Sequence, residues 1–224
     1  MNNFMRNIII ILIALLIVCV GTWFFLGDGL EEEVPEEEND EKELAEILAQ
    51  AEEIDSLTYE VTMETEERTI MAIFMQEGSN IRVQGVIEEI AEGEEVVILM
   101  DKEENSYIAY LPEQEAATQV GLGEVEKLKK GSIKDQVADL LDLDPIVTGT
   151  EVINGKDCFV VEYGHSDMRL SMWIWEDHGL PIAMEAEKNG EVMLIEVSNI
   201  EFEDVSDEEF QLPPHIEMND IPAF

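Results

Sequence analysis

The sequence predicts an α+β domain built on one large, curved antiparallel sheet of about ten strands, which two or three helices cover. First, apolar and polar residues alternate with period two along most of the chain beyond residue 56. Second, turn dipeptides, above all Asn154-Gly155 and Asn189-Gly190, separate these alternating runs. Third, two segments keep the helical period instead.

The composition indicates a folded, acidic domain. The chain has 224 residues, of which 46% are hydrophobic, too many for a disordered polymer. It carries 53 Asp and Glu against 12 Lys and Arg, and the net charge of −41 excludes nucleic-acid binding as the main function because it repels phosphates. The two cysteines, Cys19 and Cys158, are too few for a disulfide framework or a structural zinc site.

Residues 1–26 predict an N-terminal signal anchor, a single transmembrane helix. Ile8–Leu26 has no charged side chain, and its 19 residues would extend over roughly 28 Å, about the thickness of a bilayer's hydrocarbon. Arg6 precedes this run and acids follow it, so the positive-inside rule leaves the amino end in the cytoplasm. We therefore expect a single-pass protein of the cytoplasmic membrane, with its C-terminal domain on the extracytoplasmic side.

Two other fates of this segment stay open. Cleavage after Gly21 is one, since Cys19 and Gly21 are both small. Lipidation of Cys19 is the other, because Leu16–Cys19 resembles a lipobox, although Val18 stands where Ala, Gly or Ser is usual. We favour the retained anchor because no A-x-A-like cleavage site follows the apolar run.

The rest of the chain divides into an acidic linker, residues 27–40, and a folded domain, residues 41–224. The linker has eight acids in fourteen positions together with Pro35, the composition of an extended, self-repelling tether. We expect it to act as a spacer between the membrane and the domain.

Two helices are predicted in the domain. Asp40 and Glu43 resemble a capping box that opens a helix ending near Asp55. A second helix opens at Ser132 and ends before Pro145. The apolar face of the first helix consists of Leu44, Ile47, Leu48, Ala51 and Ile54.

Ten alternating runs predict strands, and after Pro112 the alternation stops until the second group begins. In the first run, apolar residues from Leu57 to Met63 alternate with polar ones, which predicts a half-buried strand with an acidic outer face. The runs lie at about 57–64, 69–76, 80–88, 94–100, 105–111, 146–153, 156–163, 168–175, 181–187 and 191–202.

Two of these strands are apolar on both faces, namely TIMAIFMQ at residues 69–76 and EVVILM at residues 95–100. Helices can cover one face of the sheet, so the other face must meet more protein, a closed barrel interior or a ligand. Many methionines lie in or beside the strands. Their flexible side chains suit a pocket for varied apolar shapes, and they equally suit an irregular core.

Over about residues 42–215 the chain resembles the LolA/LolB-like superfamily of lipoprotein carriers. The matching stretches, in order, are SLTYEVTMET, VVILMDKEENSYIAYLPEQEAAT, GTEVINGKDCFVVEYG, MRLSMWIWEDHGLPIAMEAEKNGE and VSNIEFEDVSDEEFQLPPHIEM. The resemblance implies a half-open β-barrel lidded by helices, with an apolar cavity that holds acyl chains. The chain departs from the carriers at Glu77-Gly78, where they have an Arg-Pro pair that holds the lid closed.

We therefore expect a non-enzymatic, membrane-anchored domain that binds a lipid, a lipoprotein acyl chain or another apolar ligand, in lipid or lipoprotein trafficking. The alternative is an envelope-sensing or scaffolding module that uses the same fold without a ligand. No cofactor, catalytic residue or metal site is expected, since the adjacent residues His165-Ser166-Asp167 cannot form a triad and Asp101–Asn105 lacks the rest of an EF-hand loop. The residues expected near the cavity are Tyr59, Met63, Phe74, Ile98, Tyr107, Tyr110, Trp173 and Trp175.

The charge leads to one further expectation. Lysine is scarce, at eight residues, and Glu and Asp fill the polar faces of the predicted strands and helices. At high salt, ions would screen the resulting self-repulsion over distances of about 3–8 Å. We expect an adaptation to salty surroundings.

Overall fold

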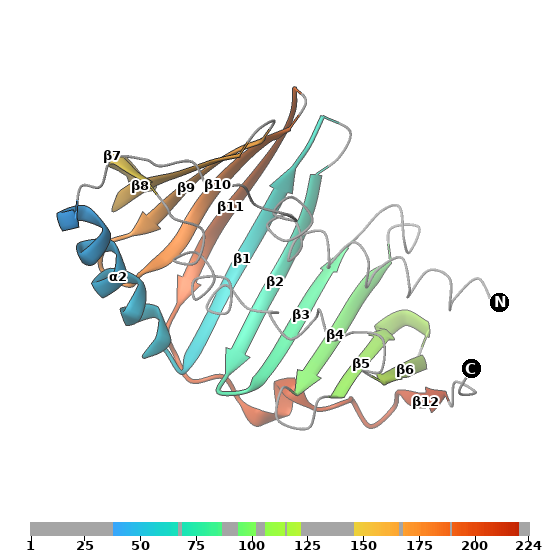
Figure 1. Ribbon diagram of the computed structural model, residues 1–224. Coiled ribbons are helices and arrows are strands. Elements are labelled where there is room, and N and C mark those ends of the chain that lie inside the picture. The colour runs from blue at the N-terminus through green and yellow to red at the C-terminus, as the bar shows by residue number, and fades with distance from the viewer. Residues whose placement is uncertain are drawn as a thin grey trace.

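The computed structural model describes residues 38–66, 69–86, 94–101, 106–114, 116–121, 146–165, 168–188 and 190–219. These residues form one twelve-stranded sheet and one α-helix, α2 (Glu38–Glu52), together with two short 3-10 turns. Figure 1 shows α2 at the end of the sheet that carries β7 to β11.

The sheet consists of two meanders joined at its centre. One runs outward from β1 to β6 and the other inward from β7 to β11, and β1 pairs with β11 between them. All neighbours are antiparallel except β12, which lies parallel to β6 at one edge. The strands are β1 (Ser56–Glu64), β2 (Thr69–Glu77), β3 (Asn80–Val86), β4 (Glu95–Asp101), β5 (Ser106–Leu111), β6 (Ala116–Gly121), β7 (Ile146–Ile153), β8 (Lys156–His165), β9 (Met168–Trp175), β10 (Leu180–Lys188), β11 (Glu191–Glu201) and β12 (Glu217–Asn219).

The ten predicted strands are confirmed, and the sheet gains β6 and β12 at one edge. The first predicted helix is confirmed as well, although α2 begins two residues before Asp40, which therefore lies inside the helix and is not its cap. Within the described ranges the sheet stays open, with β12 and β7 as its two edges.

Several predicted segments lie outside the described residues. They are the signal anchor at 1–26 with Cys19, most of the linker, and the helix predicted from Ser132. In the part of the chain that is described, no helix combines the length and the apolar character needed to cross a bilayer.

The main core lies on one face of the sheet, which we call the inner face, and α2 packs against part of it. Leu44, Leu48 and Ala51 of α2 are at most 2% exposed and belong to the same apolar cluster as the inner side chains of β1 to β5 and β8 to β11. This burial follows from the helical spacing of the apolar residues of α2. The helix stabilises the fold mainly through this face.

The opposite, outer face is covered beneath β4 and β5 by the end of the chain. Val97, Leu99 and Tyr110 point to this face and pack with Ile216 in a second, smaller apolar cluster. This confirms that EVVILM is covered on both faces, and the second cover is protein. For TIMAIFMQ the prediction is wrong at Met71, which lies on the outer face and is 59% exposed.

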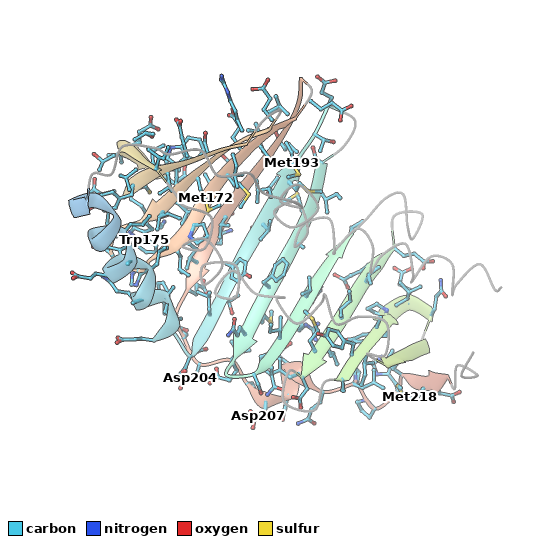
Figure 2. The ribbon with its side chains drawn as sticks, in the orientation of Figure 1. Met172, Trp175, Met193, Asp204, Asp207 and Met218 are labelled. Atoms are coloured by element: carbon cyan, nitrogen blue, oxygen red, sulfur yellow. The ribbon has the colours of Figure 1, made fainter. Side chains whose placement is uncertain are left out.

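Residues 203–219, which we call the C-terminal strap, are held to the outer face by a series of contacts. Ser56 Oγ donates a hydrogen bond to the carbonyl of Glu203 (2.6 Å), and the Val205 N–H donates to Glu77 Oε2 (3.0 Å). Further along, β12 pairs with β6. In Figure 2 the labelled residues Asp204, Asp207 and Met218 trace this strap along the lower side of the sheet.

Arg82 fixes the middle of the strap. Its Nη1 donates to the carbonyl of Glu209 (3.1 Å) and lies 3.6 Å from the Glu209 carboxylate. Nη2 donates to Gln84 Oε1 (2.7 Å), and Nη1 also lies 3.4 Å from the Tyr110 hydroxyl. Burial raises the pKa of this phenol, opposed by the nearby guanidinium. One arginine thus joins β3, β5 and the strap.

Gly179 is required where α2 meets the turn between β9 and β10. Its φ of +66° is favourable for glycine, and an added Cβ would collide with the backbone carbonyl of Ile47 in α2. Gly78 has a similar φ of +55° with no heavy atom within 4 Å of the Cβ position, so it provides a matched control.

We predict that Gly179→Ala destabilises the domain by about 3 kcal/mol or more, because backbone strain and the collision with α2 add together. Gly78→Ala should cost only about 1 kcal/mol, from strain alone. Urea denaturation of both variants measures the difference, and equal losses would contradict a close contact between α2 and the turn.

We also predict a pH dependence that arises at Glu77. The hydrogen bond from the Val205 N–H, followed by the effect of the nearby Ser56 hydroxyl, lowers the pKa of Glu77 below its ordinary value of 4.5. A lowered pKa stabilises the fold above the unfolded-state pKa, and this stability is lost as pH falls through the folded-state pKa. Glu77→Gln should therefore lower the urea midpoint at neutral pH, with a difference from the parent that shrinks below pH 4.5. A difference that does not vary with pH would contradict the contact.

Candidate functional site

The predicted cavity residues divide between the two faces of the sheet. The strand registers place Tyr59, Met63, Phe74, Ile98 and Tyr107 on the inner face. They place Tyr110, Trp173 and Trp175 on the outer face. Alternation in the sequence separates two sets of side chains without saying which set faces α2.

The inner residues lie in cross-strand rows. Tyr59 stands opposite Phe74, and their rings stack with centroids 5.0 Å apart. The row continues through Val83 and Ile98 to Ala109, so it crosses five strands without a charged or amide side chain. The five inner residues of the predicted set are each at most 4% exposed.

The next row combines apolar residues with one polar side chain. Gln76 lies between Leu57 and Ile81 and is only 5% exposed. Its Nε2 donates to the carbonyl of Gly78 (3.2 Å), whereas its Oε1 is buried without a hydrogen-bond partner. An unpaired buried acceptor is costly, so this oxygen is suited to a donor brought by a ligand.

A third row contains the smallest side chains of the inner face. Ala72 stands opposite Gly85, with Val61 and Val96 on either side. Ala72 and Gly85 are half-buried, whereas Val61 and Val96 are 7% and 3% exposed. The apolar inner face therefore reaches solvent at this pair. A lone glycine inside a strand is a signal that could have identified this place from the sequence.

The outer aromatic residues have contacts of their own. Trp173 Nε1 donates to Glu151 Oε2 (2.9 Å). Trp175, which is labelled in Figure 2, packs edge-on against His178 with ring centroids 4.2 Å apart. Its ring also lies 6.1 Å from that of Phe202 and 4.8 Å from Lys156 Nζ. These contacts hold the β9–β10 turn against the chain that follows β11.

Among the described residues, no three His, Cys, Asp or Glu side chains gather as a metal site would require. Cys158 is fully buried, and burial raises the pKa of its thiol, as expected for a structural cysteine. Arg82, Gln76 and the Ala72–Gly85 pair are absent from the residues that the sequence predicted. Arg82 and Gln76 gave no signal, since a polar residue in an alternating strand ordinarily faces solvent.

No family model and no curated protein matches the sequence. An uncharacterized conserved protein from Thermus thermophilus matches with a TM-score of 0.55 at 12% identity, over 78% of this chain and 97% of that one. A LolA superfamily protein from Nitrosomonas europaea matches with a TM-score of 0.37 at 18% identity, over 75% and 97%. The lipoprotein LppX of Mycobacterium tuberculosis matches with a TM-score of 0.49 at 14% identity, over 76% and 99%.

The structural neighbours of this chain thus include one protein described as a LolA superfamily member. At 12% identity, the match to the Thermus protein establishes a shared fold and says nothing of its chemistry.

We predict that Gly85→Ala destabilises the domain by about 1–3 kcal/mol, because a Cβ there would come within 2.6 Å of the backbone oxygen of Met71. Val86→Ala is the matched control, since Val86 is exposed on the other face and should change stability by about 0.5 kcal/mol or less. Thermal unfolding compares the two variants. Equal effects would contradict the close approach of β2 to Gly85.

Proposed function

We propose that the chain is a membrane-anchored, extracytoplasmic domain that binds a lipid, a lipoprotein acyl chain or another apolar ligand on the inner face of its sheet. The observation that carries this proposal is the solvent contact of that face at Ala72 and Gly85, beside a continuous apolar row. Little side chain projects from the backbone at this pair, so an alkyl chain would lie over it. Each buried methylene contributes about 0.8 kcal/mol to binding.

The polar part of such a ligand has a partner on the same face. The unpaired Gln76 Oε1 can accept a hydrogen bond from a hydroxyl or a protonated carboxyl group. Residues 1–26 would anchor the protein, and the acidic linker 27–40 would space the domain from the bilayer. This arrangement suits a fixed lipid-binding domain better than a shuttle, because an anchored protein cannot diffuse away from its membrane.

One observation favours the second function, an envelope-sensing or scaffolding module without a ligand. Tyr59, Phe74 and Tyr107 are at most 4% exposed, so the inner face is filled around them by the domain's own side chains. A ligand would have to enter at the Ala72–Gly85 pair and displace some of this packing. The lipid-binding function therefore requires an apolar ligand that displaces side chains from the inner face, whereas the scaffolding function requires none.

The test is lipid binding by the full chain and two variants. We expect mass spectrometry of an organic extract to detect a co-purified lipid, and a fluorescent fatty acid to bind saturably. Ala72→Phe should weaken fatty-acid binding about tenfold or more by filling the entry, a loss of about 1.4 kcal/mol. Ile73→Phe, the next residue on the opposite face, should leave affinity within about twofold.

Equal effects of the two substitutions would place binding elsewhere and contradict the inner-face site. The absence of both co-purified lipid and fatty-acid binding would favour the scaffolding function instead.

A further inference from the structure

The two edges of the sheet are unequal. At one edge β12 is only three residues long, which is how proteins commonly limit pairing with other chains. At the other edge β7 spans eight residues and is exposed over most of its length. Val152 and Ile146 are 66% and 44% exposed, high values for β-branched side chains in a strand.

The hairpin geometry determines which backbone groups of β7 point outward. Asn154 and Gly155 have φ of 51° and 78°, the signature of a type I′ two-residue turn. The flanking residues Ile153 and Lys156 then exchange both hydrogen bonds, and bonding alternates from there along β7 and β8. Thr150 and Val152 therefore direct their N–H and C=O groups away from β8, toward the free edge.

Helix α2 contacts β7, but the backbone stays accessible over part of this edge. Gly149 is exposed, and no heavy atom lies within 4 Å of the position that its Cβ would occupy. Thr150 and Val152 are exposed as well. Natural edge strands are usually protected by lysines, prolines or a covering element. Within β7 the single charged side chain is Glu151, whose carboxylate accepts a hydrogen bond from Trp173.

Charge decides which partner fits this edge. From residue 146 to residue 165 the β7–β8 hairpin carries three acids and one lysine, and the whole chain has a net charge of −41. A second copy would bring two strongly acidic domains together. The acidic linker is disfavoured for the same reason. A basic segment is instead attracted by the acidic charge that repels a second copy and the linker.

We propose that β7 is a docking edge for an extended, basic, β-branched segment of a partner protein. The segment pairs with the outward backbone groups of Thr150 and Val152 and places a lysine or arginine beside Glu151. Main-chain pairing supplies affinity, and the alternating side chains supply specificity. This surface is separate from the inner face and does not depend on ligand binding there.

The test uses a synthetic peptide that alternates valine with lysine, has blocked ends and carries a fluorophore. A second peptide has the same sequence and charge but carries backbone N-methyl groups on alternate residues, so that it cannot pair with an edge. We expect the first peptide to bind the full chain in a fluorescence-anisotropy titration, and the N-methylated one to bind about tenfold or more weakly. This comparison leaves the protein unchanged.

Two variants locate the site. Thr150→Pro removes an outward N–H and should weaken peptide binding about tenfold, while Thr150→Val keeps it and should stay within about twofold. Circular dichroism checks that both variants are folded. Hydrogen exchange should show new protection at the amides of Thr150 and Val152 when the peptide is bound.

Three results would overturn the proposal. Equal binding of the two peptides would show that diffuse charge attraction is the whole effect. Protection that appears away from β7 would place the contact elsewhere. Self-association of the protein that Thr150→Pro abolishes would show that the edge serves a second copy of this chain.

Discussion

The pairing of β1 with β11 is the interaction on which the rest of the structure depends. It joins two meanders that would otherwise be separate sheets, and it aligns Val61 with Val197 and Met63 with Ile195 on the inner face. The ladder changes register between Thr58 and Glu60, where Asn199 has a φ of +50°. Such a bulge adds local twist, so the position at which the two halves meet is also where the sheet bends.

The pairing of β1 with β11 makes one continuous apolar surface from two sets of strands. Different elements then cover the two halves of the sheet. On the inner face, α2 covers the half that carries β7 to β11, and Gly179 allows its backbone to approach the β9–β10 turn. On the outer face, the C-terminal strap covers β4 and β5, and Arg82 of β3 holds the strap at Glu209. The molecule thus has separate apolar clusters on opposite sides of β4, which explains why Val96–Met100 of that strand are all apolar.

Most of the strand order along the chain could be predicted, because alternation and turn dipeptides are local signals. Asn154-Gly155 predicted the β7–β8 hairpin, and the type I′ geometry agrees. The face of each residue could not be predicted. A period of two separates Tyr107 from Tyr110 and Ile174 from Trp175, but only the packing of α2 and the strap decides which set is inside.

The strap was missed for a related reason. Its contacts join residues more than a hundred positions apart, such as Ser56 with Glu203 and Arg82 with Glu209, and no local pattern encodes them. Likewise β12 is too short for its alternation to be recognised, and it depends on β6 for its existence as a strand. Of the apolar inner row, Tyr59, Phe74 and Ile98 are among the residues predicted from the sequence, whereas Val83, Ala109 and the accessible pair Ala72 and Gly85 are not. That this row binds a ligand stays a prediction.

The position of β11 near the end of the chain also bears on how the protein is made. A chain synthesised from its amino end produces β1 well over a hundred residues before its partner β11 exists. During that interval β1 is an unpaired edge beside an apolar surface, open to pairing with other nascent chains. Glu60 and Glu64 lie along this edge, and their charge opposes such pairing until Ser198 and Leu194 arrive opposite them. The acids of β1 would thus oppose wrong pairing of this edge before β11 is present.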